Sequence, residues 1–203
     1  MDNDTKKFLS DLLAELQRID YVRPEDIPNI DLYMDQITTF MDSQLETSKR
    51  HADDKILTKT MINNYAKNNL LPPPVKKKYS REHVLLLIFI YYFKNILSIK
   101  DIETLLAPVT EENFNNGEDF SLTDIYKEIC QHEKSRTSYL AKDIAHSFKA
   151  ASETFSNAPE EDRRSLQQFS FICSLAFDVY VKKQLIEKLI DEMPEPEHKK
   201  KKK

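Results

Sequence analysis

The most informative scarcity in this sequence is that of glycine, which occurs once in 203 residues, as Gly117. There is no tryptophan, and the nine prolines fall between periodic segments or near the end of the chain. Strand-rich folds need glycine at tight turns and bulges, so these scarcities argue against an extensive sheet and favour an all-α fold. A single glycine also excludes the Walker A loop, the dinucleotide-binding fingerprint and the nucleophile elbow of hydrolases, each of which needs two or more.

Cysteine and histidine are also sparse. The two cysteines, Cys130 and Cys173, form no C-x-x-C pair, and each lies in a segment of apolar periodicity. We expect both to be small core residues of a protein in the reducing cytoplasm. The five histidines are scattered without metal-ligand spacing, so we expect neither a metal nor another cofactor. We find no signal-peptide hydrophobic region, and the longest apolar run, residues 84–93, is about half of a membrane span.

The net charge is unevenly placed along the chain. The whole chain has a net charge of −4, yet residues 58–100 hold eight basic residues and a single acid, Glu82. This segment therefore carries +7, which leaves −11 for the rest of the chain. Any affinity for a polyanion such as a nucleic acid should be concentrated there.

Apolar periodicity predicts a series of helices. They cover about residues 1–20, 31–45, 58–68, 80–96, 98–106, 121–155 and 159–193. The helix after Ser80 is apolar on nearly all sides and should be the central core helix. The next helix should start with a capping box at Ser98 and Asp101 and end at Ala107-Pro108. The last two helices should form an antiparallel hairpin that covers the core or dimerises.

The basic segment is organised around one short helix. Thr58 is a good N-cap, and Asn68-Asn69 should end the helix, because asparagine is second only to glycine at a left-handed stop. The apolar stripe of the helix faces away from a polar, carboxylate-free surface. Three prolines follow the helix, and residues 75–79 should form an extended arm or half of a small hairpin from which three lysines project. The stripe consists of Met61, Ile62, Tyr65 and Ala66, and the polar face of Lys59, Thr60, Asn63, Asn64, Lys67 and Asn68.

This pattern predicts a contact with double-stranded DNA. Lysine, arginine and N-cap groups bind phosphates, whereas asparagine side chains can read the edge of adenine in the major groove. The phosphate-binding candidates are Thr58, Lys59, Lys67, Lys76, Lys77, Lys78 and Arg81. The base-reading candidates are Thr60, Asn63 and Asn64.

The same residues carry a resemblance to a known family. The run L-T-K-T-M-I-N-N-Y-A-K-N-N-L-L-P-P-P-V-K-K-K-Y-S-R-E-H-V, preceded by D-L-Y-M-D-Q-I-T-T-F, resembles an uncharacterised bacterial family, domain of unknown function 1836. The resemblance covers about residues 28–107. The family name implies no activity.

A second resemblance is to the winged helix-turn-helix of MerR-type transcription regulators. Tyr65, Asn69, Leu70-Leu71 and residues 72–78 stand where those proteins have a tyrosine, a glycine, two apolar residues and a basic wing with proline. This sequence departs from the pattern at Asn63, where those proteins commonly have arginine, and in a longer turn before Thr58. The resemblance implies a DNA-binding fold, a dimer formed through C-terminal helices, and a separate sensing region.

We therefore expect an N-terminal helix (residues 1–22), a MerR-like winged helix-turn-helix domain (28–110), a dimerising or regulatory hairpin (119–193) and a disordered tail (194–203). Residues 110–118 are the best candidate for a domain boundary. The leading hypothesis is a dimeric DNA-binding transcriptional regulator, because one such module rarely binds tightly and a dimer reads two half-sites. The alternative is a non-enzymatic helical module that binds other proteins. No carboxylate pair, activated nucleophile or metal set suggests an enzyme.

Overall fold

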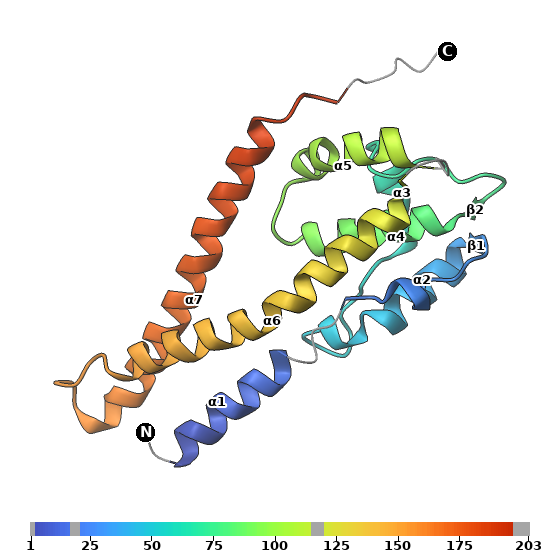
Figure 1. Cartoon of the computed structure of the whole chain (residues 1–203). Coiled ribbons are helices and arrows are strands. Elements are labelled where there is room, and N and C mark those ends of the chain that lie inside the picture. The colour runs from blue at the N-terminus through green and yellow to red at the C-terminus, as the bar shows by residue number, and fades with distance from the viewer. Residues whose placement is uncertain (1–2, 17–20, 115–119, 197–203) are drawn as a thin grey trace. The chain divides into compact units, whose positions relative to one another are not determined.

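The computed structural model describes residues 3–16, 21–114 and 120–196 (Figure 1). Within these residues the protein is all-α apart from one two-stranded sheet. The elements in chain order are α1 (Asn3–Leu16), β1 (Leu32–Tyr33), α2 (Met34–Gln44), α3 (Lys59–Lys67), β2 (Lys78–Tyr79), α4 (Arg81–Phe93), α5 (Ile99–Asn113), α6 (Leu122–Ser152) and α7 (Glu160–Asp191). The helices predicted from periodicity are all present, whereas β1 was not predicted.

The chain divides into two compact units. The first, here called the α4 unit, contains residues 21–130 together with 187–203. The second, here called the α6–α7 unit, contains residues 1–20 and 131–186. The N-terminal helix therefore groups with α6 from residue 131 onward and with α7 up to residue 186. The predicted boundary at 110–118 lies partly within α5, and residues 115–119 are outside the described residues, as are 197–203 of the predicted tail.

Helix α4 is the core of its unit, as its composition predicts. Every residue from His83 to Tyr91 is buried. The start of α6 packs on it, with the Phe89 and Tyr126 rings 5.4 Å apart, and the Tyr126 hydroxyl donates to the Val22 carbonyl at 2.6 Å. A helix that is apolar all round is stable only when other elements cover it on every side, and the α4 unit supplies that cover.

Helix α5 starts as predicted but ends later. The Asp101 N–H donates to Ser98 Oγ at 3.2 Å, and the Ser98 N–H donates to Asp101 Oδ2 at 3.1 Å, which is the predicted capping box. The prediction that Ala107-Pro108 ends the helix is wrong, because the helix continues through Pro108 to Asn113. Proline removes only one backbone donor, and the buried side chains Ile102, Thr104 and Leu106 hold the preceding turns against the core.

The α6–α7 unit has a smaller core. Phe148 and Ala151 of α6 and Phe171 of α7 are buried together, and half-buried residues of α1 pack against them. The Phe148 and Phe171 rings meet edge to face with centroids 5.1 Å apart. Of the two cysteines, Cys130 is buried as expected, but Cys173 is exposed, since it lies on the face of α7 away from Phe171. Among the described residues, no helix combines the length and apolarity that crossing a membrane requires.

Candidate nucleic-acid interface

Helix α3 turns its polar face outward. Ile62 and Tyr65 are buried, and burial raises the pKa of the Tyr65 hydroxyl. The Thr58 hydroxyl accepts a hydrogen bond from the Met61 N–H at 3.2 Å and so caps the helix as predicted. Five of the candidate contact residues are exposed on the opposite side: Lys59, Thr60, Asn63, Asn64 and Lys67.

The end of α3 is fixed by asparagine. Asn69 has a φ of 59°, in the left-handed region, and the Leu70 N–H donates to the Tyr65 carbonyl at 3.0 Å. This is the Schellman arrangement that glycine usually supports. It confirms the prediction of an asparagine stop, and it directs the chain away from the helix toward buried Leu70 and Leu71.

Residues 75–78, here called the lysine hairpin, form a two-residue turn. Val75 and Lys78 exchange both backbone hydrogen bonds, at 3.0 and 2.9 Å. The two central residues, Lys76 and Lys77, have φ values of 51° and 65°. Positive φ at both central positions defines a type I′ turn, in which asparagine and glycine are the favoured residues. Both lysine side chains are exposed.

The lysine hairpin is anchored by the small sheet. Strand β2 pairs antiparallel with β1, with Tyr33 opposite Lys78 and Leu32 opposite Tyr79. The Lys78 ammonium lies over the Tyr33 ring, 5.3 Å from its centroid. This cation–π contact leaves Lys78 half-buried, whereas Lys76 and Lys77 are exposed. Because Tyr79 is buried, the base of the hairpin is fixed while its tip projects.

Arg81 is held differently from the other candidate cations. Its guanidinium donates to the Ile27 carbonyl at 2.9 Å and to the Pro24 carbonyl at 2.5 Å. Both acceptors belong to the segment before β1, so Arg81 ties the start of α4 to that segment. These bonds use two of the five guanidinium donors, and the Nε is buried, so Arg81 offers less to a phosphate than an exposed lysine does.

A carboxylate that the sequence pattern did not reveal lies at the start of α3. Lys59 forms an ion pair with Asp35, which belongs to the first turn of α2. At the other end of the helix, the Asn69 side chain donates to Glu103 of α5 at 3.4 Å. Within α3 itself the polar face has no acid, but the fold brings acids to both of its ends. Residue spacing along one helix could not predict either contact.

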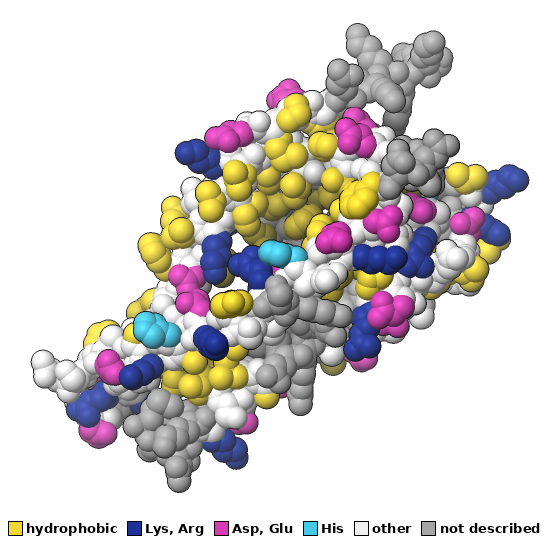
Figure 2. All heavy atoms as spheres, in the orientation of Figure 1, with side chains coloured by type: hydrophobic (Ala, Val, Ile, Leu, Met, Phe, Trp, Pro, Cys, Tyr) yellow, Lys and Arg dark blue, Asp and Glu magenta, His cyan; other side chains and the backbone are white. Residues whose placement is uncertain are grey.

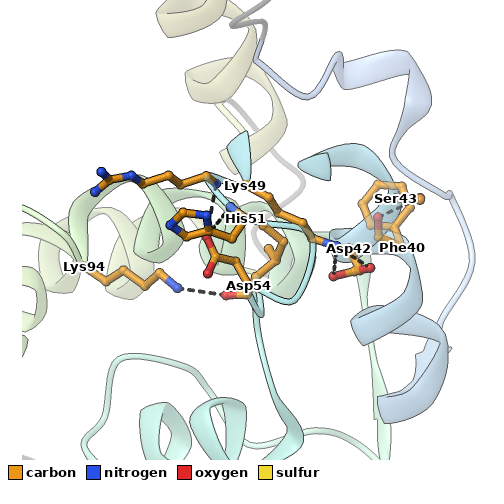
Figure 3. Close-up of polar contacts among 9 residues, drawn as sticks. Phe40, Asp42, Ser43, Lys49, His51, Asp54 and Lys94 are labelled. Atoms are coloured by element: carbon orange, nitrogen blue, oxygen red, sulfur yellow. Dashed lines mark hydrogen bonds and ion pairs between the residues drawn. The ribbon is translucent and has the colours of Figure 1, made fainter. Parts of the chain in front are cut away.

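The loop between α2 and α3 is longer than a tight helix-turn-helix turn and is held by side chains (Figure 3). The Asp54 carboxylate accepts the N–H groups of His51, at 3.0 Å, and Arg50, at 3.1 Å. The backbone hydrogen bond from His51 is the main reason that the pKa of Asp54 is lowered. Lys49 pairs with Asp42 at 2.9 Å, which fixes the start of the loop to the end of α2.

The end of the same loop is fixed to α4. Lys94 donates to the Ile56 carbonyl at 2.8 Å. Its ammonium lies 4.8 Å from the Tyr91 ring centroid, and burial lowers the pKa of Lys94. Ile56 and Leu57 are themselves buried just before the Thr58 cap. The loop therefore sets where α3 begins.

A buried histidine of α4, His83, packs against the residues that connect the lysine hairpin to this helix. His83 is 3% exposed, and its Nδ1 accepts the Ser80 N–H at 3.0 Å, in the position that glutamate or glutamine takes in a capping box. Its ring meets the Tyr79 ring, with centroids 5.4 Å apart, and the Phe114 ring, at 4.8 Å. Burial lowers the pKa of His83, although the nearby carbonyls of Pro72 and Pro73 favour its protonated form.

The fold thus presents one exposed polar helix face and one exposed basic turn in the same unit, both fixed at their bases. Hydrogen-bonding side chains on a helix and cations on a loop can contact a polyanion without further chemistry. Within the described part of the chain, no group of three or more His, Cys, Asp and Glu residues could hold a metal ion.

Comparison with known proteins places the chain in a family. A search of the curated proteins and a search of the solved structures each found no match. The family described as "Domain of unknown function (DUF1836)" matches residues 22–129, which is more than half of the chain and contains the whole candidate interface. The protein therefore belongs to the DUF1836 family.

Proposed function

We propose that this protein is a transcriptional regulator that binds double-stranded DNA through its α4 unit. In this proposal α3 is the recognition helix of a winged helix-turn-helix related to that of MerR-type regulators, and the lysine hairpin is its wing. Such a role places the protein in the cytoplasm, where bacterial DNA lies.

The observation that carries the proposal is the composition of the type I′ turn. Asparagine and glycine adopt positive φ readily, but a residue with an ordinary side chain is strained there, at a cost of order 1–3 kcal/mol. Here two consecutive lysines, Lys76 and Lys77, occupy both positions. Their side chains make an exposed pair of charges at the tip of an anchored hairpin. Strained residues of this kind cluster at functional sites, and two adjacent cations suit a phosphate backbone.

The exposed face of α3 also supports the proposal, because its side chains can hydrogen-bond to base edges. Asn63 and Asn64 are exposed and adjacent, and an asparagine amide can form two hydrogen bonds to adenine in the major groove. Thr60 lies one turn before Asn64 on the same exposed surface. Lys67 lies at the C-terminal end of the helix, where it can bind a phosphate beside the groove.

The other phosphate candidates contribute unequally. The main electrostatic attraction to phosphates would come from the exposed lysines Lys67, Lys76 and Lys77. Lys59 is paired with Asp35, and Lys78 lies on the Tyr33 ring, so both would contribute less. Thr58 uses its hydroxyl to cap α3, so it would offer a phosphate only the N-terminus of the helix. Arg81 ties the start of α4 to the segment before β1, so it would contribute less to phosphate binding than the exposed lysines.

A second candidate function is a helical module that binds other proteins. Exposed apolar side chains on α7, among them Phe169, Phe177 and Leu185, favour it, since surfaces of this kind commonly mark protein contacts. This function concerns a different surface and is compatible with DNA binding by the α4 unit.

The test is binding of the intact protein to duplex DNA. Duplexes selected by the protein from a random pool are compared with scrambled duplexes by fluorescence anisotropy across a salt titration. We expect the logarithm of the binding constant to fall linearly with the logarithm of salt, because phosphate binding releases counterions. An intact protein without salt-dependent duplex affinity would rule out the proposal and leave the protein-binding module.

Base reading is tested by replacing both asparagines with Ala (Asn63→Ala with Asn64→Ala). The preference for the selected duplex should drop by about 1–3 kcal/mol for each bidentate pair of hydrogen bonds that the substitutions remove, while the salt slope stays unchanged. The matched control replaces two exposed asparagines outside α3, Asn95→Ala with Asn157→Ala. If the α3 variant keeps the full preference, α3 is not the recognition helix.

A further inference from the structure

A partly open cavity lies within the α6–α7 unit, where α1 packs on α6 and α7. Its volume is about 110 Å³, and its floor is formed by the buried residues Phe148, Ala151 and Phe171. Phe8 of α1 forms a further part of the wall and is 43% exposed. None of the described residues that line the cavity is acidic. The cavity therefore combines an apolar interior with a lining that does not repel an anion.

The size and the lining of the cavity suit one aromatic ring. A slightly larger apolar cavity, of about 150 Å³, is known to hold benzene, and the open side adds room here. The Phe148 and Phe171 rings meet edge to face with centroids 5.1 Å apart, and the Phe8 ring lies 6.0 Å from the Phe148 ring. Aromatic rings attract one another in such tilted and edge-to-face arrangements. A single ring can therefore join this cluster, whereas a long acyl chain would exceed the volume.

Two polar side chains at the cavity are already engaged with the backbone. The Ser152 hydroxyl donates to the Phe148 carbonyl at 2.8 Å. The Gln167 amide donates to the carbonyls of Ser152, at 2.7 Å, and Thr154, at 3.1 Å. The Gln167 bonds supply partners for carbonyls that the end of α6 leaves unsatisfied. The hydrogen-bond donors available to a ligand therefore belong to the other polar side chains of the lining, which are both on α7.

These two side chains share one face of α7 with the cavity floor. Arg164, Gln168 and Phe171 are separated by four and three residues, so they follow one another along the same side of the helix. Arg164 and Gln168 are exposed, whereas Phe171 is buried. The sequence of α7 thus sets a cation and an amide at the solvent side of an apolar cavity.

Arg164 differs from its neighbour in being uncommitted. The Arg163 guanidinium pairs with Glu160 at 2.6 Å and donates to the Ala158 carbonyl at 3.0 Å. Arg164 has no hydrogen-bond or ion-pair partner among the described residues. A guanidinium is planar and binds a carboxylate through two parallel hydrogen bonds. Arg164 can therefore bind a carboxylate without giving up a contact within the protein.

We propose that this cavity binds a small aromatic carboxylate. The ring lies among Phe8, Phe148 and Phe171, and the carboxylate accepts hydrogen bonds from Arg164 at the open side, with the Gln168 amide as a further donor. Each half of such a ligand meets the part of the site that matches it in polarity. The proposal does not rest on DNA binding, and its experiments contain no DNA, so the two proposals can fail separately.

The apolar side chains exposed along α7, which Figure 2 shows, are a different feature. Phe169 and Phe177 are 61% and 64% exposed, and neither lines the cavity. A small molecule is bound in a concave site that surrounds most of its surface, which an open helix surface cannot do. Phe169 is therefore a suitable control position for the phenylalanines of the cavity.

The first experiment measures phenylacetate binding to the intact protein by NMR titration. Phenylacetate carries one ring and one carboxylate, whereas 2-phenylethanol lacks the charge and acetate lacks the ring. We expect saturable binding of one phenylacetate per chain and about tenfold weaker binding of each of the other two compounds, because the ion pair and the ring both contribute. No saturable binding of phenylacetate, or equal binding of either of the other compounds, would overturn the proposal.

The second experiment locates the carboxylate. Arg164→Gln removes the charge and keeps a good helix former at an exposed position. It should weaken phenylacetate binding about tenfold and leave 2-phenylethanol binding unchanged, a difference that a general loss of structure would not produce. The control Lys182→Gln removes an exposed cation from the same helix and should leave both affinities unchanged. Wild-type affinity of Arg164→Gln for phenylacetate would reject the proposed site.

The third experiment locates the ring. Phe8→Ala removes one wall of the cavity and should weaken phenylacetate and 2-phenylethanol binding by a similar factor, about threefold, because both present the same ring. The control Phe169→Ala removes a ring that does not line the cavity and should change neither affinity. Circular dichroism checks the folding of each variant. If Phe8→Ala binds both compounds as tightly as Phe169→Ala does, the ring does not lie in this cavity and the proposal fails.

Discussion

Two helices of this protein, α4 and α7, are rich in apolar side chains, and they differ in what covers them. From Val84 to Ile90, no residue of α4 is more than 7% exposed. On α7, Phe169, Phe177 and Leu185 are each more than half exposed. Apolar composition shows that the surface of a helix is stable only when other elements pack against it. Only the fold shows whether the same chain provides those elements. The contrast also separates the family region, which contains α4, from the region that holds most of α7.

The largest predicted difference between the two helices is in stability. Leu87→Ala in α4 removes side-chain atoms from a residue that is fully buried, and it should lower the free energy of unfolding by about 2–5 kcal/mol. Leu185→Ala in α7 removes the same atoms from an exposed residue and should change it by less than about 0.5 kcal/mol. Urea denaturation followed by circular dichroism measures both. Equal losses would mean that the side of α7 that carries Leu185 is also buried in solution.

A smaller effect concerns the one buried histidine of α4. Because burial lowers the pKa of His83, the unfolded chain binds a proton more readily than the folded chain. The stabilisation that neutral His83 contributes is therefore fully present above the pKa of histidine in the unfolded chain, about 6.5. It is lost as the pH falls from there toward the pKa of His83 in the folded protein. The melting temperature of the wild type should decrease between pH 7 and pH 5.5.

The variant His83→Gln isolates this effect. Glutamine keeps an acceptor for the Ser80 N–H, as in a normal capping box, but does not titrate, so the decrease should be smaller. His51→Gln, at an exposed histidine, is the control and should leave the pH profile as in the wild type. The pKa values of Asp54 and Asp124 are lowered because their carboxylates accept hydrogen bonds. Protonation of these carboxylates therefore destabilises the protein only at more acidic pH. An unchanged profile for His83→Gln would show that His83 does not control stability in this range.

The fold was largely predictable because its signals are local. The Thr58 cap, the capping box at Ser98 and the stop at Asn69 depend on residues within one or two turns of each other. The apolar run in α4 was sufficient to predict a central helix. The extension of α5 beyond Pro108 was missed because it depends on core packing rather than on propensity.

The candidate site was predictable only in part. The exposed side chains of α3 follow from helical periodicity, and the sequence allowed a hairpin at residues 75–79. The pairing of β1 with β2 and the ion pair between Asp35 and Lys59 join residues far apart in the sequence, so no local pattern indicates them. The same holds for Arg81, whose two carbonyl partners lie more than fifty residues earlier. The exposure of Cys173 required knowing which face of α7 is buried.

The most direct measurement of the central claim is the duplex affinity of a protein whose lysine hairpin carries the residues its turn prefers. Lys76→Asn with Lys77→Gly removes both charges and relieves both strained φ values, so the melting temperature should stay equal or rise. The salt slope of DNA binding should flatten by about 1.8, and affinity should fall. The control Lys142→Ala with Lys149→Ala removes two exposed charges from α6 and should leave the slope as in the wild type. A more stable variant that binds DNA less tightly would show that the two lysines serve phosphate binding rather than stability. Unchanged affinity and salt slope would contradict DNA binding through the lysine hairpin.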